Sequence, residues 1–339
     1  MSTLLFREAA ETAQVVATQL RRNRDVAQRL GELMRARPPR AVVTCARGSS
    51  DHAATYAKYL IETRTGAVVS SAAPSVASVY QSTQDLRHCL FLAISQSGRS
   101  PDLVAAAQAA RRAGATVAVL VNAEDSPLAQ CAEFVLPLCA GPERSVAASK
   151  SFIASLAGIL QLVAAWTEAP VLQRCLLEAP DLLAQAWELD WSPALETLRE
   201  ASHLFVIGRG LGLGVAQEAA LKGKETCGLH AEAFSGAEVR HGPQALLQGG
   251  FPALMLVQDD ETRVGLLTLA QELVERQVPV LLAGPPVAGA IELPTLVTHP
   301  ALEPLLMAQS YYRLVNALAL VRGRDPDHPP HLKKVTETH

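Results

Sequence analysis

Three charged side chains in the second half of the chain have types and a spacing that suit acid–base chemistry. Glu218, Lys222 and Glu225 are separated by four and three residues, so a helix would place them on one face. Taken alone, this pattern is typical of a surface ion-pair stripe, but its surroundings are apolar. The histidines His230 and His241 follow closely. Considered alone, the first is more typical of a packing residue and the second of a turn residue before a helix. A carboxylate and a histidine together could supply a base and an acid for proton transfer.

Two hydroxyl-rich segments each follow an apolar run and open a helical pattern. The first is Arg47-Gly48-Ser49-Ser50-Asp51, and the second runs from Ser95 to Asp102 through Gln96, Ser97 and Ser100. Ser100 suits the N-cap of a helix and Pro101 its first position. Such a segment can be a helix start only, or its hydroxyls and free amides can bind an anion. The chain has no G-x-x-x-x-G-K-[ST] motif, so cleavage of a nucleoside triphosphate is unsupported.

The apolar runs in front of these segments recur at one spacing. Arg47 and Arg209 are 162 residues apart, and each follows a short apolar run. The same spacing relates four pairs of runs: 41–45 and 203–207, 92–96 and 254–258, 117–120 and 279–282, and 134–136 and 296–298. We therefore expect two copies of one module.

The runs are apolar throughout rather than alternating, which indicates strands buried on both faces of a parallel sheet. Helix-length segments separate them, at 51–61 and 102–112 in the first copy and at 215–226 and 261–276 in the second. Each copy is therefore predicted to be a small doubly wound α/β domain, in which ligands bind beyond the carboxyl ends of the strands. The second copy has a glycine-rich loop at 208–214 and carboxylates at Asp259 and Asp260, which would repel phosphate.

Composition excludes several other classes of protein. The net charge is −3, so no basic excess is present to bind a nucleic acid. The N-terminus lacks a signal-peptide core, and the apolar stretch 152–166 is too short to span a membrane. No histidine or carboxylate pair has metal-ligand spacing, so neither a metal nor a cofactor is expected. We expect a cytoplasmic protein whose cysteines are reduced: Cys45, Cys89, Cys131, Cys139, Cys175 and Cys227.

Taken together, these motifs resemble the SIS (sugar isomerase) family. The resemblance rests on the Ser95–Gly98 turn, on Lys222-x-Lys224-Glu225, on His230–Ala233, on Glu238-x-x-His241-Gly242-Pro243 and on the tail 325–334. It is greatest to the isomerase half of glucosamine-6-phosphate synthase. The family implies two flavodoxin-like domains, each a parallel sheet flanked by helices, and a homodimer with active sites at its interface.

The resulting domain prediction has five parts. A helical segment at 1–36 precedes a first SIS domain at 37–165, which would bind phosphate. A helical linker at 166–200 leads to a second SIS domain at 201–325 with the acid–base residues. A tail at 326–339 would contribute a lysine.

The resemblance also implies roles for individual residues in binding a small sugar phosphate. Glu225 would be the general base, His241, from its own or the partner chain, would open the sugar ring, and Lys334 would meet the open-chain carbonyl. Lys222 would lie beside Glu225. The remaining predicted ligands would hold the substrate, chiefly its phosphate: Ser49, Ser50, Ser95, Gln96, Ser97 and Ser100.

The sequence departs from the synthase pattern at three places. It begins Met1-Ser2-Thr3, without the cysteine of a glutaminase domain, Arg99 replaces an acidic residue, and Ala148 replaces a serine. Arg99 followed by Ser100-Pro101-Asp102 is closer to the SIS-type glucosamine-6-phosphate deaminases. We therefore expect deamination of glucosamine 6-phosphate to fructose 6-phosphate and ammonia. The alternatives are a ketose/aldose isomerase, a fructosamine-phosphate deglycase and a non-catalytic sugar-phosphate sensor.

Overall fold

The computed structural model describes residues 3–334, which fold into two compact units that interleave along the sequence. One, the first-sheet unit, comprises residues 14–143 and 151–177 with Lys333 and Lys334. The other, the second-sheet unit, comprises the chain up to Ala13, residues 144–150 and residues 178–332.

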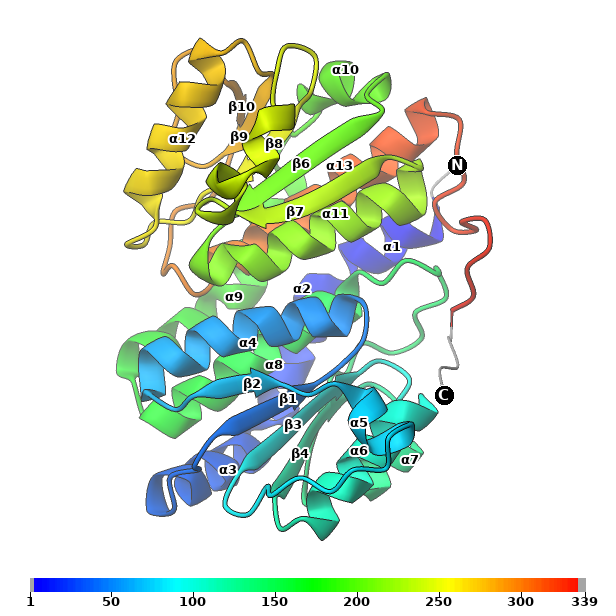
Figure 1. The fold of residues 1–339 in the computed structure, drawn as a ribbon, viewed down its shortest axis with the longest axis vertical. Coiled ribbons are helices and arrows are strands. Elements are labelled where there is room, and N and C mark those ends of the chain that lie inside the picture. Colours follow the sequence, from blue (N-terminus) through cyan, green and yellow to red (C-terminus); the bar gives the residue numbers. More distant parts are fainter. Residues whose placement is uncertain (1–2, 335–339) are drawn as a thin grey trace. The chain divides into compact units, whose positions relative to one another are not determined.

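The first-sheet unit contains five parallel strands in the order β2-β1-β3-β4-β5. Its strands are β1 (Val42–Cys45), β2 (Val69–Ser71), β3 (Leu90–Ser95), β4 (Thr116–Val121) and β5 (Phe134–Pro137). Its helices are α2 (Thr12–Arg22), α3 (Arg24–Ala36), α4 (Ser49–Thr65), α5 (Pro74–Ser78), α6 (Pro101–Arg112), α7 (Pro127–Gln130) and α8 (Lys150–Thr167). Helices lie on both faces of the sheet (Figure 1), and α6 and α7 share the core on one of them.

The second-sheet unit repeats this architecture with the order β10-β9-β8-β6-β7. Its strands are β6 (His203–Gly208), β7 (His230–Ser235), β8 (Ala253–Leu256), β9 (Val280–Ala283) and β10 (Ile291–Leu293). Its helices are α1 (Leu4–Ala10), α10 (Ala194–Arg199), α11 (Leu213–Cys227), α12 (Arg263–Glu275) and α13 (Glu303–Val321), and α9 (Pro170–Glu188) contains the boundary between the units. Three short 3-10 helices lie at Gly210–Gly212, Glu238–His241 and Pro243–Leu246.

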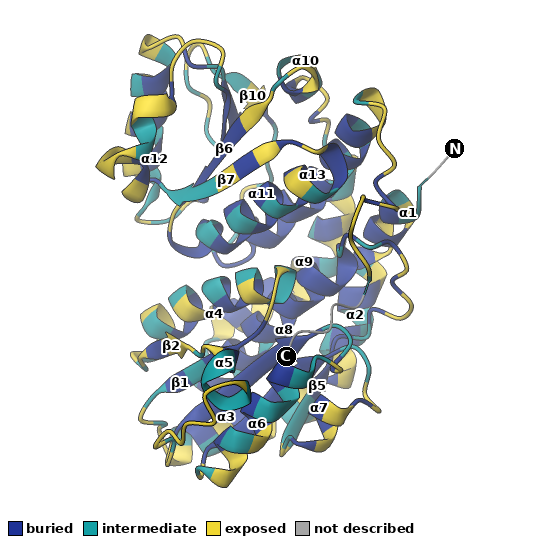
Figure 2. Ribbon diagram, turned by 45° about the vertical axis from the view of Figure 1, so that its right-hand side comes forward, coloured by how far each residue is buried: buried dark blue, intermediate teal, exposed yellow. Residues whose placement is uncertain are grey.

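The prediction of two α/β domains with parallel sheets is confirmed. All residues of β3, β8 and β9 are buried, whereas β7 at the edge of its sheet has exposed residues, drawn yellow in Figure 2. In the first sheet, Phe91 and Val119 face the core of α6, while Leu120 packs beside Gly158 of α8 on the opposite face. Strands covered on both faces must be apolar at every position, which is why apolar and polar residues do not alternate along them.

Three of the four pairs of runs at the 162-residue spacing fall on equivalent strands, β1 with β6, β3 with β8 and β4 with β9. The fourth assignment is wrong, because residues 296–298 are not a strand and β10 lies at Ile291–Leu293. Twelve residues, including α7, connect β4 to β5, whereas only seven connect β9 to β10. The shorter connection, which contains Pro285 and Pro286, moves the last strand five residues toward the N-terminus.

Several separate helices form both the N-terminal part of the chain and the connection between the two sheets. Residues 3–36 form α1, α2 and α3, and α3 ends at Ala36 because Pro38 and Pro39 follow and cannot continue a helix. Helix α4 ends at Gly66, whose φ of +73° is the left-handed cap conformation.

Judged by length and composition alone, helix α8 is long and apolar enough to cross a membrane. It has 18 residues and is therefore longer than the apolar stretch 152–166 identified in the sequence. However, 83% of it is buried inside the protein, which is the pattern of a core helix.

Candidate functional site

The turn between β3 and α6 is fixed from inside by Ser95 and Gly98. Ser95 is 5% exposed, and its Oγ accepts a hydrogen bond of 3.0 Å from the amide of Gly98. Gly98 has a φ of +61°, and a Cβ there would lie 2.1 Å from Oγ of Ser126. Ser126 in turn caps α7. Only glycine fits this position, so the local sequence dictates a tight turn.

Gln96, Ser97 and Ser100 of this turn are partly buried, whereas Arg99 is exposed. Ser100 occupies the predicted N-cap position and Pro101 begins α6, but the Ser100 hydroxyl makes no cap hydrogen bond. Ser97 Oγ accepts a hydrogen bond of 3.3 Å from the amide of Arg99. Within residues 3–334, the side chains of Gln96 and Ser100 have no hydrogen-bond partner, so both are available to an external ligand.

The start of α4 lies beside this turn. Gly48, with a φ of +55°, is the cap, and the partly buried Ser49 and Ser50 form the first turn of the helix. Strands β1 and β3 pair in parallel, with Cys45 opposite Ala93, so their carboxyl ends are neighbours. In the order β2-β1-β3 the connections after β1 and β3 diverge, and such a switch point is where doubly wound sheets bind ligands. The structure therefore brings together the predicted phosphate ligands.

Helix α11 in the second-sheet unit carries the predicted acid–base cluster. Nζ of Lys222 lies 2.5 Å from Oε2 of Glu225 and 3.4 Å from Oε1 of Glu218, as the spacing of four and three residues predicts. The side chains of Lys222 and Glu218 are 1% and 2% exposed, whereas that of Glu225 is 18% exposed. Tyr312 of α13 donates a hydrogen bond of 3.0 Å to Glu218. The cluster is thus buried at one end and open at Glu225.

The two carboxylates determine the charge of the lysine between them. Burial alone would lower the pKa of Lys222, but Glu218 and Glu225 outweigh it and hold that pKa above its usual value. Lys222 therefore stays protonated near neutrality. The ammonium of Lys222 thus supplies the positive charge that lies beside the carboxylate of Glu225.

Two glycines lie near the end of α11, and at the first of them an added Cβ would make only ordinary van der Waals contacts. A Cβ at Gly223 would lie 3.4 Å from Cβ of Ala231 on β7 and 3.8 Å from Oη of Tyr311 on α13. Gly228, with a φ of +58°, ends the helix in the left-handed conformation.

His241 lies at the end of a 3-10 helix and is exposed. No hydrogen bond or ion pair joins its ring to another described residue, and none links it to Glu225. The structure thus gives His241 no packing role, and its predicted role in ring opening stays a prediction.

The described part of the tail ends in an ion pair. Nζ of Lys334 lies 3.1 Å from Oε2 of Glu143, whose side chain is 0% exposed. The backbone amide and the hydroxyl of Ser151 also donate hydrogen bonds to this carboxylate, at 3.1 and 2.7 Å. Lys334 therefore belongs to the first-sheet unit, together with the hydroxyl-rich helix starts. Residues 335–339 of the predicted tail lie outside the described residues.

Comparison with known proteins decides the family. A sequence model of the SIS domain matches residues 37–165 and 197–283, which is more than half of the chain. The chain belongs to the SIS domain family. The isomerizing glutamine–fructose-6-phosphate aminotransferase of Symbiobacterium thermophilum is 35% identical over 318 residues, which cover 87% of this SIS chain and 51% of that protein. The chain thus spans about half the length of the curated relatives it matches.

Solved structures agree with this assignment. A candidate phosphosugar isomerase of Silicibacter pomeroyi DSS-3 is 40% identical, with a TM-score of 0.92 over 96% of this SIS chain and 100% of its own. A glucosamine-6-phosphate deaminase of Thermotoga maritima is 23% identical, with a TM-score of 0.74 over 96% of this chain and 100% of its own. At that identity the likeness shows the fold alone.

Sequence reasoning missed the roles of two carboxylates in this SIS protein, each of which holds a positively charged side chain. Glu143 anchors Lys334, and Asp102 binds Arg47 through hydrogen bonds of 3.0 and 2.8 Å. Both carboxylates are buried, and each is distant in sequence from its partner. A local sequence pattern therefore cannot predict either ion pair. The available signal for Asp102 was its place in the first turn of α6, directly after the hydroxyl-rich turn.

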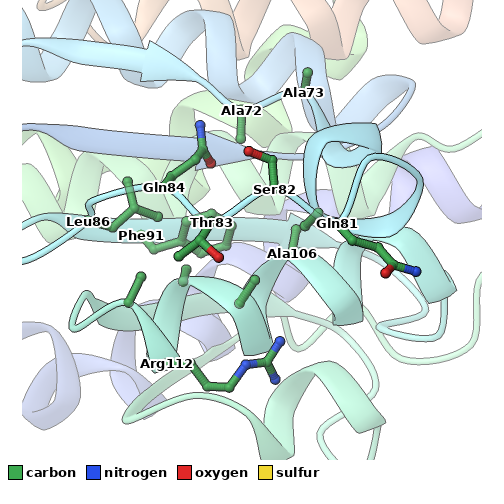
Figure 3. A pocket seen from close by; sticks show the side chains of 14 residues that line it. Ala72, Ala73, Gln81, Ser82, Thr83, Gln84, Leu86, Phe91, Ala106 and Arg112 are labelled. Atoms are coloured by element: carbon green, nitrogen blue, oxygen red, sulfur yellow. The ribbon is translucent and has the colours of Figure 1, made fainter.

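Other features of the SIS chain lie apart from these groups. A cavity of about 430 Å³ lies between the loop 81–86 and α6, and Figure 3 shows Gln84, Ser82 and Thr83 of the loop above the helix. None of the predicted site residues lines it. Across residues 3–334, no group of three or more His, Cys, Asp or Glu side chains could hold a metal ion.

Proposed function

We propose that this SIS protein converts glucosamine 6-phosphate to fructose 6-phosphate and ammonia. The observation that carries the proposal is the cluster on α11, in which a partly open carboxylate, Glu225, is held beside a buried, charged Lys222. Moving a proton between adjacent carbons requires one ionised carboxylate fixed in position. The family supports a phosphosugar substrate, and a 40% identical protein is named as a candidate phosphosugar isomerase.

The phosphate group would be held at the helix starts of the first-sheet unit. Gln96 and Ser100 have free side chains there, and Ser49, Ser50 and Ser97 lie beside them at the same pair of strand ends. Ser95 would act by closing the turn, since its Oγ is already bonded to the Gly98 amide. Hydroxyls and amides of this kind suit an oxyanion.

The reaction would begin with the ring opened to a C1 aldehyde and a C2 amine. Glu225 would remove the proton from C2 and return it to C1, while one proton passes from the nitrogen to the C1 oxygen. The product is the C2 imine of fructose 6-phosphate. Water would add to C2, and the C–N bond would break to release ammonia and leave the ketone.

His241 and Lys334 would assist at the oxygen atoms. His241 is exposed and unbonded, so its ring is available to move the proton that ring opening requires. Lys334, held by Glu143, would donate a hydrogen bond to the open-chain oxygen. Its neutral amine could instead add to C1 and expel that oxygen as water, which gives an imine through which Glu225 can make the same proton transfer. We further propose a homodimer in which His241 acts in its own or the partner's site.

A second candidate is isomerisation of a ketose or aldose phosphate. It uses the same transfer by Glu225 with a hydroxyl at C2 in place of the amine, and the name of the Silicibacter pomeroyi relative favours it. A deglycase acting on fructosamine phosphates would use the same residues. Arg99, next to Ser100 in the turn, is the sequence feature that favours the deaminase.

Purified protein should be incubated separately with glucosamine 6-phosphate, fructosamine 6-phosphate and a panel of hexose 6-phosphates. Ammonia is measured with a coupled dehydrogenase and the sugar products by mass spectrometry. Fructose 6-phosphate and ammonia in equal amounts from glucosamine 6-phosphate are expected. Sugar interconversion without ammonia would identify an isomerase, and tight binding without any product would identify a sensor.

A further inference from the structure

The proposed phosphate site has hydroxyls and amides but, among its predicted ligands, no cation. A phosphate monoester carries close to two negative charges at neutral pH, and neutral donors alone balance them poorly. Two arginines lie at this place. Arg99 of the turn forms a 3.9 Å ion pair with the exposed Asp125, and Arg47 lies two positions after β1, directly before Gly48, the cap of α4.

A buried carboxylate fixes the Arg47 side chain. Its Nε and Nη2 donate hydrogen bonds of 3.0 and 2.8 Å to Oδ2 of Asp102. Asp102 lies in the first turn of α6, two residues after Ser100, and its side chain is 1% exposed, whereas that of Arg47 is 51% exposed. The guanidinium is therefore held against the start of α6 with an open side, and its Nη1 has no partner within the described residues.

The second-sheet unit provides an internal comparison. Arg209 follows β6 as Arg47 follows β1, 162 residues later, yet the position equivalent to Asp102 is Val264, which is 72% exposed. The Arg209 side chain makes no ion pair within the part of the chain that the structure describes. The arginine thus occurs in both units, but a buried carboxylate orients it only where the hydroxyl-rich helix starts lie.

We propose that Arg47 binds the substrate phosphate and that Asp102 is the residue that positions it. This rests on the proposed function only in the choice of a sugar phosphate as ligand. Arginine presents several N–H donors in a rigid fork, so two can bind Asp102 while another binds a phosphate oxygen. The ion pair orders the side chain before the ligand arrives and neutralises a carboxylate that would otherwise repel it.

The test compares Arg47→Gln, Arg47→Lys and Asp102→Asn with the matched control Arg209→Gln. Dissociation constants for inorganic phosphate and for glucosamine 6-phosphate are measured by calorimetry, and KM and kcat by ammonia release. We expect Arg47→Gln to weaken both ligands at least tenfold and raise KM equally, with kcat within about threefold of wild type. Arg47→Lys should recover part of the affinity, Asp102→Asn should lose part of it, and Arg209→Gln should change nothing.

An Arg47→Gln variant that melts at a lower temperature but binds both ligands like wild type would overturn the proposal, because the pair would then be only structural. Wild-type protein that binds neither ligand would overturn it as well. Loss of phosphate affinity in a protein that releases no ammonia would instead leave the role of Arg47 standing and contradict the proposed function. If Arg47→Gln releases ammonia and binds both ligands with wild-type affinity, the proposed function stands and the role of Arg47 in phosphate binding is contradicted.

Discussion

Nζ of Lys334 lies 3.1 Å from Oε2 of Glu143, and this contact holds the last described residue of the tail. The carboxylate is fully buried and accepts two further hydrogen bonds from Ser151. Burying an unpaired carboxylate costs free energy, so Lys334 stabilises the buried charge of Glu143 while Glu143 fixes the position of Lys334. The tail therefore has a defined anchor that no sequence pattern announces.

Removing either partner of this pair should release the tail. Glu143→Gln and Lys334→Met are expected to increase hydrogen exchange of residues 331–334 at least tenfold, because the ion pair is lost in both. The start of the tail should stay protected, since Asp327 keeps its hydrogen bonds from the amides of Leu4 and Leu5. Lys334→Arg should keep the tail in place, since arginine retains the charge, but should lose most turnover because it cannot act as the amine. Lys333→Met, at the exposed neighbouring lysine, is the control. Equal exchange in all variants would show that the pair does not hold the tail.

The buried lysine on α11 should contribute strongly to stability. Lys222→Met leaves Glu218 buried without its cation, so we expect a loss of about 3–5 kcal/mol in urea unfolding at pH 7.5. Lys224→Met, at an exposed lysine of the same helix, should change stability by less than about 0.5 kcal/mol. A loss below about 1 kcal/mol for Lys222→Met would contradict the assignment of a buried charge cluster.

The raised pKa of Lys222 also sets the sign of a pH dependence. The stabilisation from its charge is fully present below the unfolded-state pKa near 10.4 and is lost as the pH rises through the higher pKa of the folded protein. Stability should therefore show no Lys222 transition between pH 7 and pH 9 and should fall in the alkaline range. The prediction would be contradicted if the stability of wild type fell with a midpoint below pH 9 and Lys222→Met showed no such fall.

Gly98 should be needed for phosphate binding. Gly98→Ala forces a positive φ on alanine and drives its Cβ into Ser126, so we expect a loss of roughly 3 kcal/mol and a KM at least tenfold higher. Gly141→Ala is the matched control, because Gly141 also has a φ of +61° but no atom within 4 Å of an added Cβ. It should cost about 1 kcal/mol and leave KM unchanged. Similar KM values for the two variants would show that the turn at Gly98 does not take part in substrate binding.

The parallel sheets were predictable because strands covered on both faces must be apolar at every position. The helix carrying Lys222 and Glu225 was predictable because spacings of three and four residues define a helix face. Strand β10 was misplaced because a shorter connection interrupts the 162-residue spacing, and a short loop leaves no periodic signal. Asp102 and Glu143 were missed because their partners are brought close only by the fold.

His241 should matter for turnover and little for stability. It is exposed and unbonded in the described structure, so His241→Asn should leave the melting temperature within about 1 °C. The value of kcat on glucosamine 6-phosphate should fall at least about a hundredfold if the ring nitrogen moves the ring-opening proton. The affinity for sorbitol 6-phosphate, an acyclic phosphate that needs no ring opening, should be unchanged. An unaltered kcat would contradict a role for His241 in ring opening.

The central claim is that Glu225 transfers the proton between C1 and C2 of a phosphorylated amino sugar. Its most direct test is ammonia release from glucosamine 6-phosphate by wild type and by Glu225→Gln, which keeps the size of the side chain and removes its basicity. We expect the variant to bind substrate and lose at least about a thousandfold in kcat. Release of ammonia by Glu225→Gln at the wild-type rate would contradict the claim.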